Sequence, residues 1–571
     1  MKKFLVTLFA VVCVAPWMLS GGTYFVSVNV KCDTPEAAQK AQLRFLPLPH
    51  GKDVAFSCRW DDSSLAHGAL QPLLKKYGYR GTFYLNETGN KAFWQQVFPL
   101  LHRDGFTIGN HTRSHKELPR LSANGIHYEI MAWKMLLEYR SDQSVTTFIV
   151  PYGKINSEFF PGVPTLIGSL LRRAGIYGGT DFSPDIYRHY GTGKDLHFSG
   201  CIVRPGDRNT KKEKFDADVK RHLASGAEHL ALGIHSWHSA ADLKVLEQCL
   251  KKYAFNPRWW YCNENDYIAY KFLYHNAKVV EKSVKGDMVC FQVLLPTPGR
   301  LGSDVALDAV CNGRKVSVCH KKALPEKIGI AAGNGRCAKF PGVRAFLRKG
   351  TDNSYRLELT NDGSALEDVT LTVVLPPVFK DEQRVISCGK VEKMLSARVY
   401  EYTRRDPERE SSGRELTAVA VDFVRDGKAG RLWVQHIEDI KHPATAVYPL
   451  YYRYAALNKK ELTELSCGGG DLSKFAVVQS KMEQRRGMFS LRFEQNWKNV
   501  PLVAVVEFNG GKDFVLRGEL PPEIIVCGKV FKTVRNQVRF SAPAGKCRLV
   551  MNILPGKRML REIAVILDAV R

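Results

Sequence analysis

The fold is decided by a short stretch in the first third of the chain. Residues 104–115 read DGFTIGNHTRSH, in which a short run at Thr107–Gly109 leads into a polar segment with two histidines four positions apart. A brief apolar run of this kind beside Gly and Asn is typical of a β-strand that ends in a turn. We therefore expect a buried strand that ends just before a cluster of chemically active side chains.

Strands and helices alternate on both sides of this stretch. Short runs rich in β-forming residues occur at Val54–Cys58, Gly81–Leu85 and Thr146–Val150, and helical spacing is found between them at Leu65–Tyr77, Ala92–Arg103 and Tyr128–Tyr139. This alternation is typical of a mostly parallel β/α architecture, either a barrel or an open sheet. We expect it to extend from about residue 53 to residue 276.

Three polar clusters follow strands of this pattern. Asp61 and Asp62 come after Val54–Cys58, His111 and His115 follow the run described above, and the sequence Ile234–His238 follows Glu228–Leu232. In β/α folds the loops at the carboxyl ends of the strands form the active site. The three clusters are therefore expected to meet at one edge of the sheet.

These residue types suit metal-assisted hydrolysis. Two imidazoles and one carboxylate form a ligand set that leaves positions open for water and substrate. His111 and His115 are four residues apart, so one helical turn would place them on the same side. A divalent ion activates bound water and polarises a carbonyl, a second carboxylate takes the water proton, and a histidine opposite protonates the leaving amine. The pattern predicts hydrolysis of an amide or ester.

Each cluster by itself has an ordinary structural explanation. An Asp-Asp pair is usually a turn or a helix cap, two exposed histidines four apart are common, and His235 alone could be a hydrogen-bonded core histidine. It is the joint occurrence of the clusters, after strands and in this order, that favours a metal site.

The same residues resemble a known family. Residues 51–275 resemble a polysaccharide deacetylase domain, also called the NodB homology domain, of carbohydrate esterase family four. The motifs that carry the resemblance are Phe56–Asp62, Gly81–Leu85, Asp104–His115, Pro151–Gly153 and Leu232–His235. The second half of the chain takes no part in it.

The resemblance implies a fold, an activity and a set of roles. Members of the family have a distorted β/α barrel, bind a divalent metal ion, commonly zinc, and remove acetyl groups from N-acetylglucosamine units or acetylated sugars, so the chain is expected to be a hydrolase of non-peptide carbon–nitrogen bonds. Position by position, Asp61 would be the general base, Asp62, His111 and His115 would hold the metal, and His235 would be the general acid. His238 is the alternative general acid, and Tyr152 is a supporting candidate.

One position departs from the family pattern. Two residues before its proline the third motif normally carries an arginine beside the catalytic aspartate, and this chain has Ile149 there. A partly buried carboxylate needs a positive partner because burial disfavours its charged form. Of the nearby candidates, Arg59 would have to fold back along its strand, and Arg113 on a helix would point away. We therefore expect Arg204, after a predicted strand at Ser199–Val203, to replace the missing arginine.

The pattern changes after residue 275. Short β-rich segments such as Met288–Leu294, Tyr355–Leu359, Val369–Leu375 and Leu502–Glu507 are separated by Gly, Asn, Asp and Pro turns. This is typical of antiparallel β-sandwich domains. We expect one such domain at 276–400, a C-terminal β-rich domain at 401–571, and an N-terminal lead-in at 23–50. The chain is thus predicted to be a multidomain α/β plus all-β protein.

The N-terminus is typical of a signal peptide at residues 1–22. Lys2 and Lys3 precede the apolar run Phe4–Val14, and the small residues Ser20, Gly21 and Gly22 suit a cleavage site. No later apolar run is long enough to cross a bilayer. We expect an exported protein that is periplasmic, on the cell surface or extracellular.

Charge and composition narrow the choice of partners. The 571 residues carry a net charge of +26, spread along the chain, which favours anionic cell-surface polymers; no nucleic-acid motif is present, so nucleic acid is not expected. The expected function is removal of N-acetyl or O-acetyl groups from an extracytoplasmic glycan. Two alternatives remain: a degenerate, non-catalytic glycan-binding protein, and a hydrolase of a non-peptide C–N bond in a small molecule.

Overall fold

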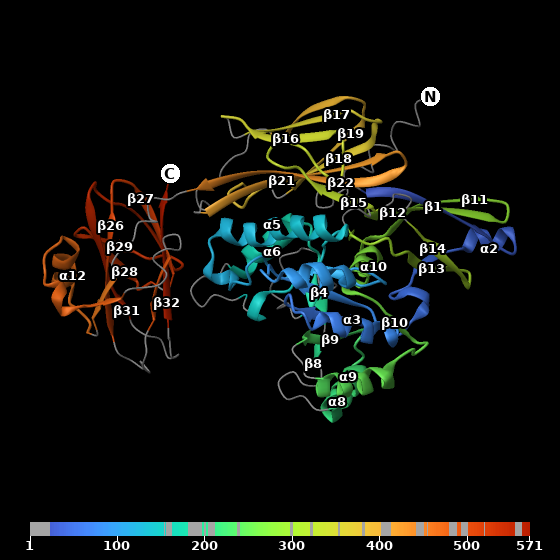
Figure 1. Ribbon diagram of the computed structural model, residues 1–571, viewed down its shortest axis with the longest axis horizontal. Coiled ribbons are helices and arrows are strands. Elements are labelled where there is room, and N and C mark those ends of the chain that lie inside the picture. The colour runs from blue at the N-terminus through green and yellow to red at the C-terminus, as the bar shows by residue number, and fades with distance from the viewer. Residues whose placement is uncertain are drawn as a thin grey trace.

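The chain forms one α/β unit and three β-rich parts (Figure 1). The structure is a computed structural model that describes residues 23–153, 155, 163–180, 197–198, 201–203, 212–236, 240–296, 301–319, 324–351, 354–379, 383–400, 413–440, 450–453, 455–478, 488–492, 501–518, 520–553 and 562–570. The prediction of an α/β fold followed by mostly antiparallel sheets is confirmed.

The α/β unit is built on a parallel sheet with β3 (Val54–Asp61) at its centre. The strand order is β5-β4-β3-β9-β8, where the other strands are β4 (Gly81–Leu85), β5 (Thr107–Asn110), β8 (Cys201–Val203) and β9 (His229–His235). The strand β10 (Trp259–Tyr261) pairs in parallel with the start of β3. The strand β3 is buried along its whole length. It extends beyond its predicted end at Cys58 and includes the polar residues Arg59 and Asp61.

Further parallel pairs extend this sheet around a barrel. Isolated bridges join Asn110 to Phe148 and Thr147 to Gly178, and β6 (Gly179–Thr180) pairs with β7 (His197–Phe198). Neighbouring strands thus follow chain order around the unit. Two residues outside the described ranges separate β7 from β8 in the chain, and β8 pairs in parallel with β9.

Helices cover the outside of the sheet. They are α3 (His67–Lys76), α4 (Phe98–Leu101), α5 (Ala123–Ser141), α6 (Val163–Arg173), α8 (Lys212–Ala224), α9 (Ala240–Tyr253) and α10 (Glu264–Asn276). A π-helical turn at Phe93–Val97 precedes α4, where one continuous helix was predicted. The longest helix, α5, begins at a cap in which the Ser122 side chain accepts from the Gly125 N–H, and it ends at Asp142 in the left-handed region.

The N-terminal residues are part of a β-rich region and not a simple lead-in. The strand β1 (Thr23–Lys31) pairs with β12 (Met288–Pro296), which also pairs with β11 (Lys278–Lys285). A second small sheet has the order β14-β13-β2, from Arg314–Val318, Leu307–Cys311 and Leu43–Phe45. The helix α2 (Pro35–Lys40) lies between the two N-terminal strands in the chain.

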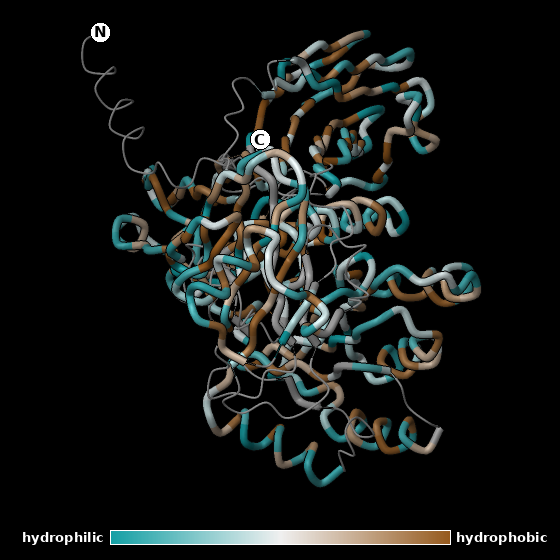
Figure 2. The backbone as a smooth tube through the Cα atoms, turned by 90° about the vertical axis from the view of Figure 1, so that its left-hand side faces the viewer, coloured by the Kyte–Doolittle hydropathy of each residue, from teal (hydrophilic) through white to brown (hydrophobic). Residues whose placement is uncertain are grey.

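A two-sheet sandwich follows, and we call residues 327–440 the sandwich. Its sheets have the orders β15-β22-β21-β18-β19 and β16-β17-β20. The strands are β15 (Lys327–Ile330), β16 (Val343–Lys349), β17 (Tyr355–Asn361), β18 (Leu366–Val374), β19 (Gln383–Val391), β20 (Met394–Tyr400), β21 (Gly413–Arg425) and β22 (Lys428–Ile440). Burial alternates along β16 and β17. The backbone tube in Figure 2 changes repeatedly between hydrophilic and hydrophobic residues along the chain. Since β21 pairs with β18, residue 400 is not the border that the sequence suggested.

The C-terminal part is also β-rich, as predicted, and lies at one side of the molecule (Figure 1). One sheet has the order β24-β23-β26-β31-β28-β29, from Ala476–Val478, Leu450–Arg453, Leu502–Asn509, Lys546–Ile553, Glu523–Val526 and Lys529–Lys532. The other has the order β25-β32-β27-β30, from Met488–Arg492, Glu562–Val570, Asp513–Gly518 and Gln537–Ser541. A short helix, α12 (Lys459–Ser466), accompanies them.

The sandwich packs directly on the α/β unit. Figure 1 shows α5 and α6 beneath β21 and β22, and one hydrophobic core cluster contains residues of both parts, including Ile130 and Ile167 from the helices and Leu416 and Trp433 from the strands. The two parts therefore share a core and are not joined only by a linker.

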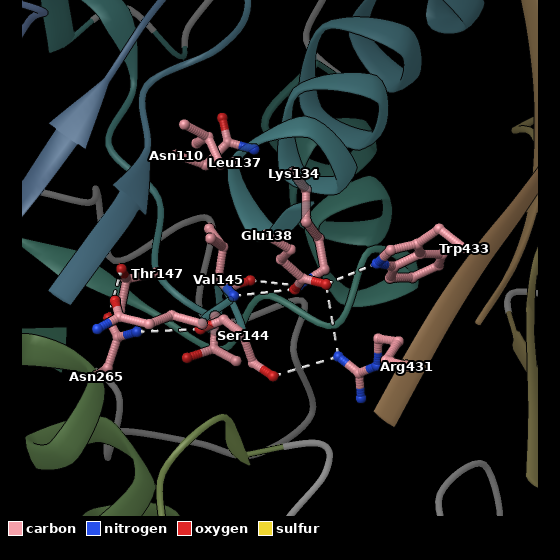
Figure 3. A network of polar contacts seen from close by, with 12 residues as sticks. Asn110, Lys134, Leu137, Glu138, Ser144, Val145, Thr147, Asn265, Arg431 and Trp433 are labelled. Atoms are coloured by element: carbon pink, nitrogen blue, oxygen red, sulfur yellow. Dashed lines mark hydrogen bonds and ion pairs between the residues drawn. The ribbon is translucent and has the colours of Figure 1, made fainter. Parts of the chain in front are cut away.

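A buried polar network lies in the same interface (Figure 3). Glu138 on α5 accepts a hydrogen bond from the Trp433 indole at 2.7 Å and lies 3.5 Å from the guanidinium of Arg431 on β22. Lys134 pairs with Glu138 from the preceding turn of α5. Burial alone would raise the pKa of Glu138, but the charges of Lys134 and Arg431 hold it below its ordinary value. The network thus places Glu138 between one positive group of the helix and one of the sheet.

The predicted signal peptide at 1–22 lies outside the described residues. Among the helices of the described ranges, none is both long and apolar enough to span a membrane. No disulfide joins the cysteine side chains that the structure describes.

Candidate metal and catalytic site

The three predicted metal ligands meet at the carboxyl edge of the parallel sheet. The donor atoms of Asp62, His111 and His115 all lie within 4.8 Å of one another. The two Nε2 atoms are 3.1 Å apart, and Asp62 Oδ1 lies 3.7 Å from His111 Nε2 and 3.3 Å from His115 Nε2. Such a group of two imidazoles and one carboxylate matches the open ligand set expected of a catalytic divalent metal.

The hydrogen bonding of His111 fits this role. Its Nδ1 lies 2.9 Å from the carbonyl oxygen of Ile149, so Nδ1 carries the proton and the lone pair of Nε2 points to the other donors. Burial lowers the pKa of His111, and this effect outweighs the opposing negative charges of Asp61 and Asp62. The imidazole is therefore neutral near pH 7, which is the form that binds a metal.

The two histidines lie on a loop, not on a helical turn as the spacing suggested. We call residues 111–115 the metal-binding loop. Thr112 and His115 have positive φ angles of 62° and 50°, which no α-helix allows. The side chain of Asn110 accepts the Thr112 N–H at 2.9 Å and so stabilises the first of these turns. The backbone reversal, and not the helical period, brings the two imidazoles together.

Asp62 is oriented by residues that the sequence did not single out. Its backbone is left-handed, with φ at 70°, and its carbonyl oxygen lies 2.7 Å from His67 Nε2. Asn86 donates to Asp62 Oδ1 at 3.1 Å and also accepts the N–H of Ser63. Asn86 follows β4 directly, so its position after a strand was the available signal.

Asp61 is paired with Arg59, contrary to our expectation. The guanidinium donates from Nη2 to Oδ2 at 2.6 Å and from Nε to Oδ1 at 3.2 Å, and both side chains are almost fully buried. Alternation along β3 puts the two residues on the same face. The arginine side chain does fold back along its strand, and the reasoning that excluded it was wrong. Arg204, the residue that we expected in this role, lies outside the described residues.

His235 lies beside this pair. It is the last residue of β9, directly opposite Asp61 in the β3–β9 register. Its Nε2 is 3.9 Å from Asp62 Oδ2, and its side chain is partly exposed. A proton donor at this position can therefore face a molecule bound at the three ligands. His238, the alternative donor, lies outside the described residues.

The remaining candidates surround the loop. Tyr152 is 63% exposed, and its ring meets that of His115 edge-on at 4.6 Å between centroids. Arg113 binds Glu87 through Nε at 2.8 Å. Ile149, in place of the family arginine, is buried.

Another histidine lies deeper in the unit. His229 is buried at the start of β9, with Nε2 3.0 Å from the hydroxyl of Ser57, and its ring stacks on Tyr267. Burial lowers the pKa of His229 to about 3. It is therefore a neutral core residue and has no part in the metal group.

Comparisons with known proteins agree with this site. The chain matches the family model described as Polysaccharide deacetylase over residues 53–163. A chitin deacetylase from Arthroderma benhamiae is 31% identical over 88 residues, 15% of this chain and 24% of that protein, so the match spans about a quarter of the relative's length. The matched family segment contains Asp61, Asp62, both histidine ligands and Tyr152, and it ends before His235.

Solved structures show more distant likenesses. The peptidoglycan deacetylase PdaC from Bacillus subtilis is 19% identical, with a TM-score of 0.26 over 38% of this chain and 89% of that chain. A family 4 carbohydrate esterase from Streptomyces lividans, in complex with acetate, is 15% identical, with a TM-score of 0.26 over 35% of this chain and 88% of that chain.

Proposed function

Residues 53–163 belong to the polysaccharide deacetylase family, and from this premise we propose that the chain removes acetyl groups from a glycan by metal-dependent hydrolysis. The observation that carries the proposal is the convergence of Asp62, His111 and His115 on one point. Asp61 and His235, one on each of two adjacent strands, flank that point. The arrangement has a ligand group, a base and an acid, which together suffice for amide hydrolysis.

The metal, which we propose to be zinc, would be held by the three ligands, where it would polarise the acetyl carbonyl and make water more acidic. Asp61 would accept a proton from the attacking water. The water oxygen joins the acetyl carbon, the carbon–nitrogen bond breaks, and His235 would donate the proton that the leaving amine nitrogen needs. Acetate and a free amine result.

Arg59 keeps Asp61 available for this role. The guanidinium occupies one lone pair on each carboxylate oxygen, and it compensates a charge that burial would otherwise disfavour. It also restrains Asp61, whereas Asp62 has its Oδ1 atom within 4 Å of the Nε2 atoms of both histidines. This division explains how adjacent aspartates can serve as base and ligand.

We further propose that the substrate lies outside the cytoplasm. The support is the N-terminal sequence, in which two lysines, an apolar run and three small residues follow the order of a signal peptide. Expressed in a secreting host, the protein should be recovered outside the cytoplasm with a new N-terminus near residue 23. Recovery of the intact N-terminus inside the cell would contradict export and leave the hydrolytic proposal unaffected.

The proposal is tested by acetate release over a panel of acetylated glycans, with metal analysis of the same protein. The wild type should release acetate, lose this activity on chelation and regain it with Zn²⁺. Asp61→Asn is the matched control, because it keeps the shape of the base and the metal ligands but removes the proton acceptor. A metal-loaded wild type no more active than Asp61→Asn on every glycan would contradict the proposal.

A further inference from the structure

We propose that the sandwich positions the metal-binding loop through Tyr128 and Arg414, so that the metal site depends on a strand nearly 300 residues away in the chain. The inference depends on the proposed function only for the identity of the metal-binding loop. A continuous series of hydrogen bonds runs from β21 through α5 to residue 113, which lies between the two histidine ligands.

The metal-binding loop needs support from outside itself. Two of its five residues, Thr112 and His115, have left-handed backbones although neither is glycine. Each such residue costs about 1 kcal/mol or more and persists only where neighbouring groups fix it. The ligand geometry therefore depends on what holds this backbone.

Helix α5 supplies the first contacts. Glu129 is buried, and its carboxylate accepts the backbone N–H and the hydroxyl of Ser114, both at 2.7 Å. Its carbonyl oxygen accepts the N–H of Arg113 at 3.1 Å. One residue of α5 thus binds the loop at two consecutive positions between the histidines.

The preceding residue of α5 links the loop to the sandwich. The hydroxyl oxygen of Tyr128 accepts from Nη1 of Arg113 at 2.8 Å and from Nη1 of Arg414 at 2.6 Å. Both guanidiniums also lie near its ring, at 5.7 Å and 5.0 Å from the centroid. A hydroxyl has two lone pairs, so Tyr128 can accept both bonds at once.

The charges around Tyr128 are balanced on each side. The guanidinium of Arg113 pairs with Glu87, and that of Arg414 lies 3.6 Å from Asp439. The two positive groups can therefore share one hydroxyl without an uncompensated repulsion. Removing the hydroxyl would release both arginines from a common point.

Arg414 is the second residue of a strand that is fixed to α5. Two residues further along β21, the carbonyl oxygen of Leu416 lies 3.0 Å from Nε2 of His127. The network of Glu138, Arg431 and Trp433 holds the neighbouring strand β22 to the same helix (Figure 3). Since strand and helix share a core, Arg414 has a defined position relative to Tyr128. The sandwich is therefore part of the metal-binding unit.

The test is titration of the full-length, metal-free protein with Co²⁺, whose visible spectrum reports the geometry of the bound ion. Tyr128→Phe, Arg414→Ala and their combination are compared with the wild type. The control is Arg348→Ala, which removes another exposed arginine of the sandwich, one that pairs with Glu358 at 2.9 Å.

We expect Tyr128→Phe and Arg414→Ala each to weaken Co²⁺ binding by about threefold to tenfold, less than the 10–100-fold typical of a residue that bonds a ligand directly. Each should also change the visible spectrum of the folded protein. The double variant should bind Co²⁺ no more weakly than the single variant that has the lower affinity, because both changes break the same Tyr128–Arg414 contact. Arg348→Ala should match the wild type.

Unchanged affinity and spectrum in Tyr128→Phe and Arg414→Ala would overturn the inference, and so would fully additive losses. Glu129→Gln provides an independent check that the assay detects loss of loop support, since its carboxylate binds the loop directly. None of these measurements uses acetate release. A wild type that binds Co²⁺ in the expected way but deacetylates nothing would therefore refute the proposed function and leave this inference standing.

Discussion

Replacing Arg59 by methionine tests the pairing that holds the proposed general base. The side chains of Arg59 and Asp61 are 5% and 4% exposed, and two hydrogen bonds of 2.6 Å and 3.2 Å join them. Methionine fills similar space but leaves the Asp61 carboxylate without this partner. Breaking a buried pair on one side typically costs about 3–5 kcal/mol, so we expect Arg59→Met to lower the free energy of unfolding by about that much.

The assay is a double-mutant cycle in chemical denaturation, with Asp61→Asn as the second change. Each single variant leaves one buried charge unpaired, whereas the double variant leaves none. The double variant should therefore recover most of the stability lost by Arg59→Met. Turnover should fall in Arg59→Met while the metal content stays near that of the wild type, because the three ligands are untouched.

Two results would refute this reasoning. One is an Arg59→Met variant that unfolds within about 1 kcal/mol of the wild type, which is an ordinary value for a substitution that breaks no special contact. The other is a cycle in which the two losses simply add, since additivity is expected of residues that do not interact. Arg348→Ala again provides the matched control for loss of an exposed, paired arginine.

Three further predictions concern proton transfer and pH. Asp61→Asn should keep its metal and lower kcat by a factor on the order of 10²–10⁴; wild-type turnover would exclude it as the base. His235→Ala should have a similar effect and His238→Ala a mild one, and the reverse order in steady-state kinetics would exchange their roles. Burial lowers the pKa of His229 from 6.5 to about 3, so the unfolded chain takes up the proton first as the pH falls. His229 should therefore contribute up to about 1.4 kcal/mol per pH unit to the decrease in the free energy of unfolding below about pH 6.5. His229→Gln should reduce the slope of denaturation curves recorded over pH by that amount; an unchanged slope would contradict it.

The sheet and the ligand group could be predicted because both follow local rules. The bounds of β4 agree with the run Gly81–Leu85, since apolar β-formers end there at a polar loop. Asp62, His111 and His115 each follow a strand, and parallel strands bring such positions to one edge. The contacts of Asp62 with His111 and His115 follow from that rule.

Other features of the fold and the site could not be predicted, because they depend on the directions of side chains and on strand pairings between segments far apart in the chain. The fold of Arg59 back onto Asp61 needs a barrel interior that excludes water, which the i−2 spacing alone does not reveal. The four-residue spacing of His111 and His115 suggested a helix. The left-handed backbone at Thr112 and His115 could not be predicted, because neither residue is a glycine. Pairings such as β1 with β12 join segments more than 250 residues apart, and hydrophobic periodicity contains no information on partners at that distance.

The central claim is that Asp62, His111 and His115 bind one divalent ion, and metal analysis of two purified proteins tests it directly. The wild type should contain about one ion per chain, and the His111→Ala, His115→Ala double variant should contain none while remaining folded. Cysteine thiols are the competing source of bound metal, and they are the same in both proteins. Equal metal content in the wild type and the double variant would contradict the account.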